Sequence, residues 1–146
     1  MQVIYAKEHV PHSIFLVGPT PRSKAVKSWR PEALAMLAEL KYKGTVYSPE
    51  PRDGNWSSGY EDQIEWENQA IQSSTCVVAW VPRDIETMPA FTTNVEFGML
   101  LRSGKFLYGR PDGSPKCAYL DYMYTKTTGK EPVSNLAVLL AKASTF

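Results

Sequence analysis

Short apolar runs that alternate with helix-like segments are the feature that most constrains the fold of this chain. The clearest run, residues 13–18, ends where Gly18 meets Pro19, two residues that break regular structure. A run of this kind, bounded by breakers, is typical of a buried β-strand. On this pattern we expect five strands, at residues 13–18, 45–47, 76–81, 106–108 and, from a weaker signal, 117–120.

The segments between these runs carry helical spacing. Leu34, Leu37 and Leu40 recur at helical intervals behind Ser28 and Pro31, residue types that favour a helix start. We expect further helices at about residues 58–73, 93–103 and 132–143. Strands that alternate with helices favour a doubly wound parallel sheet. We therefore predict a single α/β domain over residues 1–146, with a flavodoxin-like five-stranded sheet in the order 2-1-3-4-5 flanked by helices.

Charge and composition exclude several classes of function. The formal net charge is +1, so the chain lacks the excess of positive charge that is typical of proteins that bind nucleic acid or a membrane surface. Cys76 and Cys117 belong to no Cys-x-x-Cys or Cys/His cluster, so we expect no metal. No Walker or Gly-x-Gly-x-x-Gly loop is present, and we expect no cofactor. The start of the chain has no leader-like pattern and no run has membrane-spanning length, so we expect a cytoplasmic protein.

The segment at residues 91–98, Phe-Thr-Thr-Asn-Val-Glu-Phe-Gly, is the strongest candidate for chemistry. It follows the apolar run at 76–81, and ligands bind beyond the carboxyl ends of the strands in an open α/β sheet. We expect Glu96 in the first turn of a helix, where the helix dipole holds it ionised and able to act as a nucleophile. Thr93 and Asn94 add donors beside it. Equally, Thr93-x-x-Glu96 is a capping box with no function beyond the helix start.

Glu67 is the second candidate. With Ile64 and Ile71 it occupies one stripe of an expected helix, and a carboxylate on an apolar stripe must be paired, protonated or functional. Because this helix leads into the strand at 76–81, Glu67 is expected near Glu96. The alternative is a boundary position from which the side chain reaches solvent.

The loop after the first strand is the third candidate. Gly18, Pro19 and Thr20 present a backbone with little side-chain bulk, which lets a ligand approach closely. Arg22 could meet a phosphate, although a solvated basic face explains it as well. Trp56 lies in a loop, where a large aromatic side chain either packs on its own protein or covers a ligand.

Taken together, four segments of the chain resemble the nucleoside 2-deoxyribosyltransferase family, in the branch with Trp-Glu and Thr-x-x-Glu-Phe-Gly signatures. The resemblance covers residues from about 13 to about 122. The segments are Ile-Phe-Leu-Val-Gly-Pro-Thr at 14–20, Gln-Ile-Glu-Trp-Glu at 63–67, Val-Ala-Trp-Val-Pro at 78–82 and Thr-Thr-Asn-Val-Glu-Phe-Gly at 92–98.

The resemblance implies a flavodoxin-like fold and exchange of the base between 2′-deoxynucleosides and free nucleobases, without a cofactor. Glu96 would attack the anomeric carbon of deoxyribose and form a covalent ester, which a second base then displaces with net retention. Glu67 would orient the sugar and handle protons. The loop Gly18, Pro19 and Thr20 would contribute to the base pocket.

Two positions depart from the pattern of the family. Phe15 stands where many members carry a tyrosine that steadies the nucleophile. Many members also carry an aspartate a few residues before the nucleophile, and here Thr93 or Asn94 would have to substitute for it. The family further implies a homodimer or an assembly of dimers, with Tyr119 and Asp121 of a neighbouring subunit completing the site.

Two other functions stay open on the sequence. A hydrolase of the same family would use water as the acceptor and act on deoxynucleosides or their 5′-monophosphates, with Arg22 and Thr20 as the candidates for a phosphate site. A non-catalytic nucleotide-binding module would use Glu96 only as a capping residue. We rank the module lower, because it gives Glu67 no purpose on its apolar stripe.

Overall fold

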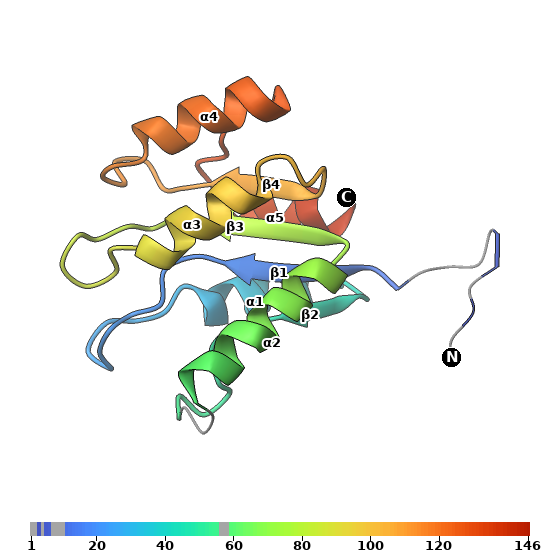
Figure 1. The fold of residues 1–146 in the computed structure, drawn as a ribbon, viewed down its shortest axis with the longest axis horizontal. Helices are drawn as coiled ribbons and strands as arrows, with labels where there is room; N and C mark the ends of the chain where they lie inside the picture. The colour runs from blue at the N-terminus through green and yellow to red at the C-terminus, as the bar shows by residue number, and fades with distance from the viewer. Residues whose placement is uncertain (1–2, 4, 7–10, 56–58) are drawn as a thin grey trace.

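A parallel sheet forms the centre of the computed structural model, which describes residues 3, 5–6, 11–55 and 59–146, and within these it has four strands (Figure 1). The strands β1 (Ser13–Val17), β2 (Thr45–Tyr47), β3 (Cys76–Trp80) and β4 (Phe106–Gly109) lie in the order β2-β1-β3-β4. Phe15 pairs with Tyr47 on one side and with Val77 on the other. Every residue of β1, β3 and β4 is buried, which explains why these strands are apolar runs.

Helices cover both faces of the sheet (Figure 1). Phe97 and Tyr124 join the core on the face of α2, α3 and α4, whereas Leu37 and Leu139 join the core on the face of α1 and α5. The helices are α1 (Arg30–Glu39), α2 (Tyr60–Ser73), α3 (Phe91–Leu100), α4 (Ala118–Thr128) and α5 (Leu136–Ser144). No helix in the described part of the chain is long and apolar enough to cross a membrane.

The expected fifth strand at residues 117–120 is wrong. These residues begin α4, in which Leu120 and Tyr124 are the buried positions and Gly129 ends the helix in the left-handed region, at φ 72°. Leu120 and Tyr124 are four residues apart, so they lie on one face of a helix, and this spacing outweighs the short apolar run at the helix start. The predicted sheet order therefore holds only as far as its fourth strand.

One residue takes the place that a fifth strand would have beside β4. Val133 forms a single parallel bridge with Gly109. Its N–H donates to the carbonyl oxygen of Tyr108 at 3.1 Å, and its own carbonyl oxygen accepts from the N–H of Arg110 at 3.0 Å. Asn135 then caps α5 by accepting from the N–H of Val138, so this helix begins later than the expected residue 132.

Gly18 carries the chain out of β1 through a space that admits no side chain. A Cβ atom at this position would collide with the carbonyl oxygen of Trp80 and lie 2.7 Å from the ring of Trp29. The end of β1 thus passes directly against the end of β3. This close approach brings the loops that follow the two strands together at the carboxyl edge of the sheet.

The substitution Gly18→Ala is expected to lower the free energy of unfolding by about 1–3 kcal/mol, because overpacking forces the backbone at Trp80 or the ring of Trp29 to move. Urea unfolding measures the change. Gly98→Ala in α3 is the matched control: its Cβ would meet nothing within 4 Å, and alanine favours a helix interior by about 1 kcal/mol. Equal effects of the two substitutions would contradict the steric argument.

Candidate functional site

A cleft of about 550 Å³ lies at the carboxyl ends of β1 and β3. The loop after β1, the first two turns of α2 and the first two turns of α3 form its walls. Ligands bind at this place in open α/β sheets, where the connections from neighbouring strands diverge. The cleft is therefore the candidate functional site.

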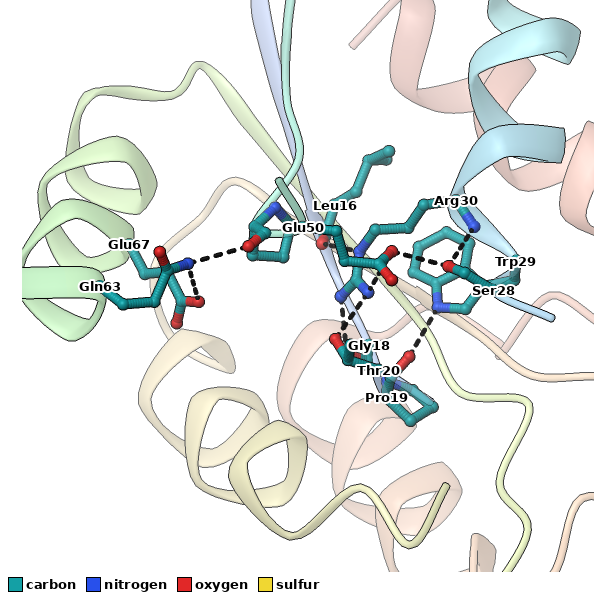
Figure 2. Close-up of polar contacts among 11 residues, drawn as sticks. Leu16, Gly18, Pro19, Thr20, Ser28, Trp29, Arg30, Glu50, Gln63 and Glu67 are labelled. Atoms are coloured by element: carbon teal, nitrogen blue, oxygen red, sulfur yellow. Dashed lines mark hydrogen bonds and ion pairs between the residues drawn. The ribbon is translucent and has the colours of Figure 1, made fainter. Parts of the chain in front are cut away.

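Two carboxyl groups face this cleft from different helices. Glu67 reaches it from α2 and Glu96 from α3. The side-chain amide of Gln63 donates to Oε1 of Glu67 and to the carbonyl oxygen of Pro49, both at 2.9 Å, and so orients Glu67 (Figure 2). Within the described ranges, no three His, Cys, Asp or Glu side chains cluster as metal ligands would.

The start of α3 differs from the expected capping box. The N-cap residue is Ala90, in the left-handed region at φ 62°, and its carbonyl oxygen accepts from the N–H of Asn94 at 3.1 Å. Thr93 thus lies inside the helix and is 2 % exposed, so it caps nothing. Glu96 stands in the second turn rather than the first, which corrects the expected position and leaves the capping interpretation of Glu96 without support.

Burial raises the pKa of Glu96, the negative charge of Glu67 adds to the rise and the charge of Arg30 opposes it, which together bring the pKa to about 7. The expectation that the helix dipole holds Glu96 ionised is therefore wrong near neutral pH. The dipole acts mainly within the first turn, and here desolvation and a like charge outweigh it. A carboxyl group that titrates near pH 7 can hold or release a proton during a reaction, and it is a nucleophile when ionised.

Arg30 is a residue of the cleft that the sequence analysis missed. Its side chain is 2 % exposed, and its guanidinium donates to the carbonyl oxygens of Leu16 at 3.2 Å and Gly18 at 2.7 Å and to the hydroxyl of Thr20 at 2.9 Å (Figure 2). A signal was present in the sequence: a cation in the first turn of a helix opposes the helix dipole, so it needs acceptors of its own.

Most of the other expected binding residues line the cleft. Phe15, at the end of β1's pairing with β2, is 1 % exposed and contributes a ring to the cleft wall. Gly18, Pro19 and Thr20 form the wall above it, where the carbonyl oxygen of Pro19 accepts from the indole of Trp29 at 3.1 Å.

Of the remaining expected residues, the structure places Asn94 apart from this group. Asn94 does not line the cleft, because its Oδ1 accepts from the guanidinium of Arg83 at 2.6 Å. Trp56 lies outside the described residues. Thr93 does line the cleft, so of the two candidates for the missing aspartate it is the one near the carboxyl pair.

Tyr119 and Asp121, expected to act from a neighbouring subunit, do not line this cleft. Tyr119 is 75 % exposed on α4. Asp121 accepts from the hydroxyl of Tyr108 at 2.9 Å and from Arg110 at 2.7 Å, beside a second cleft of about 700 Å³. In that second cleft, Arg110 and Asp121 already pair with each other, and neither Glu67 nor Glu96 lines it. We therefore place the candidate site at the cleft of about 550 Å³.

Comparison with models of known protein families identifies the family. A family model described as nucleoside 2-deoxyribosyltransferase like matches residues 11–113, which include all four strands and both Glu67 and Glu96. No curated protein matches the chain.

Replacing Glu96 by glutamine is expected to stabilise the protein above pH 7 by up to about 3 kcal/mol. The pKa of about 7 exceeds the ordinary value of 4.5, so the folded state keeps a proton that the unfolded state releases, and stability is lost as pH rises through this window. The variant cannot lose this proton. Urea unfolding at pH 4 and pH 8 measures the difference, with exposed Glu65→Gln as control. Equal stability of variant and wild type at pH 8 would contradict the buried charge.

Proposed function

The chain belongs to the nucleoside 2-deoxyribosyltransferase-like family, and from this premise we propose that it exchanges the nucleobase of 2′-deoxynucleosides by way of a covalent deoxyribosyl-glutamate. One observation carries the proposal: Glu96 and Glu67, on separate helices, face the same cleft at the carboxyl edge of the sheet. A displacement at a sugar carbon needs such a pair, one carboxylate to attack and one carboxyl group to move a proton.

In the proposed reaction, ionised Glu96 attacks C1′ of the deoxyribose. The bond from C1′ to the base nitrogen breaks, the base keeps the electron pair, and Glu67 supplies the proton that neutralises it. The nitrogen of a second base then attacks C1′ and returns a proton to Glu67. The ester bond breaks, Glu96 is released as a carboxylate, and two inversions give retention.

The walls of the cleft support a planar base and a sugar. Phe15, Pro19 and Ile64 present apolar surface, while Thr20 and Thr93 present hydroxyl groups. Planar bases are held by apolar surface with a few polar groups that fix their orientation. We propose Gly18 as the point of closest backbone approach, and Trp56 remains a proposed contact to the ligand.

We also propose a homodimer that forms through α3. Phe91, Val95 and Met99 stand at spacings of four residues and are 70 %, 64 % and 71 % exposed, which makes one apolar stripe along the helix. Phe91 also lines the cleft, so a copy packed on this stripe would stand beside the cleft. Tyr119 and Asp121 remain the proposed contribution of that copy, and Tyr119 is the more accessible of the two.

A specific observation favours a second candidate, hydrolysis of deoxynucleoside 5′-monophosphates. Arg22 is exposed where it lines the cleft, and its guanidinium carbon lies 5.9 Å from the centre of the Phe91 ring. A guanidinium at the mouth of a nucleoside cleft matches the geometry of a phosphate group. Water would then replace the second base as the acceptor.

The assay that tests these proposals supplies 2′-deoxyinosine and free adenine and follows the products by chromatography. We expect 2′-deoxyadenosine from wild type, a loss of at least about 10³-fold in Glu96→Gln, and little change in the exposed control Glu65→Gln. Free hypoxanthine without exchange, strongest with the 5′-monophosphate, would favour the hydrolase. No product, with nucleosides still raising the melting temperature, would favour the non-catalytic module.

The dimer is tested by Val95→Glu, which places a charge in the middle of the α3 stripe. We expect a monomer by light scattering where wild type is a dimer, because an unpaired charge is costly to bury in an interface. Val138→Glu on α5 is the matched control, since Val138 is also a half-exposed helical valine but lies on the other face of the sheet. A monomeric wild type would contradict the proposal.

A further inference from the structure

Two adjacent residues after β2 contact both walls of the cleft. The carbonyl oxygen of Pro49 accepts from Gln63, which holds Glu67 on the α2 side (Figure 2). The carboxylate of Glu50 accepts from Arg30 at 3.1 Å and from the hydroxyl of Ser28 at 2.6 Å on the other side. This short segment therefore connects the proton-handling carboxyl group with the buried guanidinium.

Glu50 supplies the counter-charge that a buried guanidinium needs. Arg30 is 2 % exposed and Glu50 is 21 % exposed, so the pair is largely removed from water. An isolated charge in such a place would be strongly unfavourable, whereas a hydrogen-bonded pair is tolerated. Ser28, two residues before Arg30 in the chain, accepts from the N–H of Arg30 and donates to Glu50, which fixes the carboxylate in place.

We propose that Arg30 and Glu50 are a positioning pair for the cleft carboxyl groups: Arg30 sets the electrostatic field at Glu67 and Glu96, and Glu50 limits that field. Arg30 at the same time holds the loop at Gly18 and Thr20 through its other hydrogen bonds. The catalytic part of this inference rests on the proposed function, whereas the electrostatic part is a property of the folded chain.

The charges around Glu96 decide the direction of each effect. Arg30 lowers the pKa of Glu96 and Glu67 raises it. Removing the negative charge of Glu50 leaves the field of Arg30 unopposed, so the pKa of Glu96 falls. Removing both charges takes the field of Arg30 away, so the pKa rises again. The titratable groups that line the cleft with Glu96 are Arg22 on the loop after β1, Arg30 on α1, and Tyr60 and Glu67 on α2, and Glu50 lies behind Arg30 as its ion-pair partner.

The experiment follows the side-chain carboxyl carbon of Glu96 by NMR as pH is varied, with the signal assigned from Glu96→Gln. Glu50→Gln keeps an oxygen that accepts from both Arg30 and Ser28, so the variant retains the local hydrogen bonds. We expect its Glu96 midpoint to fall by about half a pH unit or more. The double variant Arg30→Gln/Glu50→Gln should return the midpoint to a higher pH than Glu50→Gln alone.

Glu39→Gln, which removes an exposed carboxylate from the far end of α1, is the matched control and should leave the midpoint where it is. An unchanged or raised midpoint in Glu50→Gln would overturn the proposal. If the chain catalyses base exchange, the acid limb of its kcat/KM profile should move with the midpoint. If it does not, the proposed function fails while the NMR midpoints still decide the positioning pair.

Discussion

The hydrogen bonds from the guanidinium of Arg30 to the main chain after β1 are the interaction on which the rest of the site depends. Arg30 begins a helix that covers one face of the sheet, yet its side chain reaches the carboxyl edge and accounts for the carbonyl oxygens of Leu16 and Gly18. Leu16 lies beyond the last pair of β1 with β2, at Phe15, and Gly18 follows the end of β1. The same side chain places a positive charge in the cleft that Glu67 and Glu96 line. Arg30 therefore both holds the loop after β1 and favours ionisation of Glu96.

The carboxyl pair is an unfavourable arrangement that the fold maintains. Burial and a neighbouring negative charge both oppose ionisation of Glu96, and only Arg30 among its principal electrostatic neighbours favours it. Sites that perform chemistry commonly hold groups in such environments, since a perturbed pKa is what suits a carboxyl group to act near neutral pH. The Pro49 carbonyl, acting through Gln63, and the Glu50 carboxylate show that the support for this arrangement comes from a segment outside the carboxyl pair.

The sequence was informative where one physical effect dominates. The runs that became β1 and β3 are apolar throughout because both faces of the sheet are covered, and the residues that break regular structure after each run marked them as strands. The run at 117–120 was ambiguous between strand and helix, and the later buried position at Tyr124 decided it. Residue spacing identified Glu67 and Glu96 as candidates. It did not predict that Asn94 accepts a hydrogen bond from Arg83, because no local pattern specifies a partner eleven residues away. Arg30 was missed because its acceptors, apart from Thr20 and Glu50, are main-chain oxygens. Every residue has such an oxygen, so the residue types do not show which ones a side chain will bind.

The left-handed conformation of Ala90 has a consequence for how this site can change. The backbone at Ala90 sets the first turn of α3, and no side chain caps this helix. The side chains of Phe91 and Thr92 are therefore not needed to start the helix. Both are exposed and both line the cleft. The rim can therefore acquire new side chains, and with them a different fit to a ligand, while the carboxyl group one turn further along keeps its place. The side chains of the cleft rim and the placement of Glu96 are thus set by different parts of the chain, so one can change without the other.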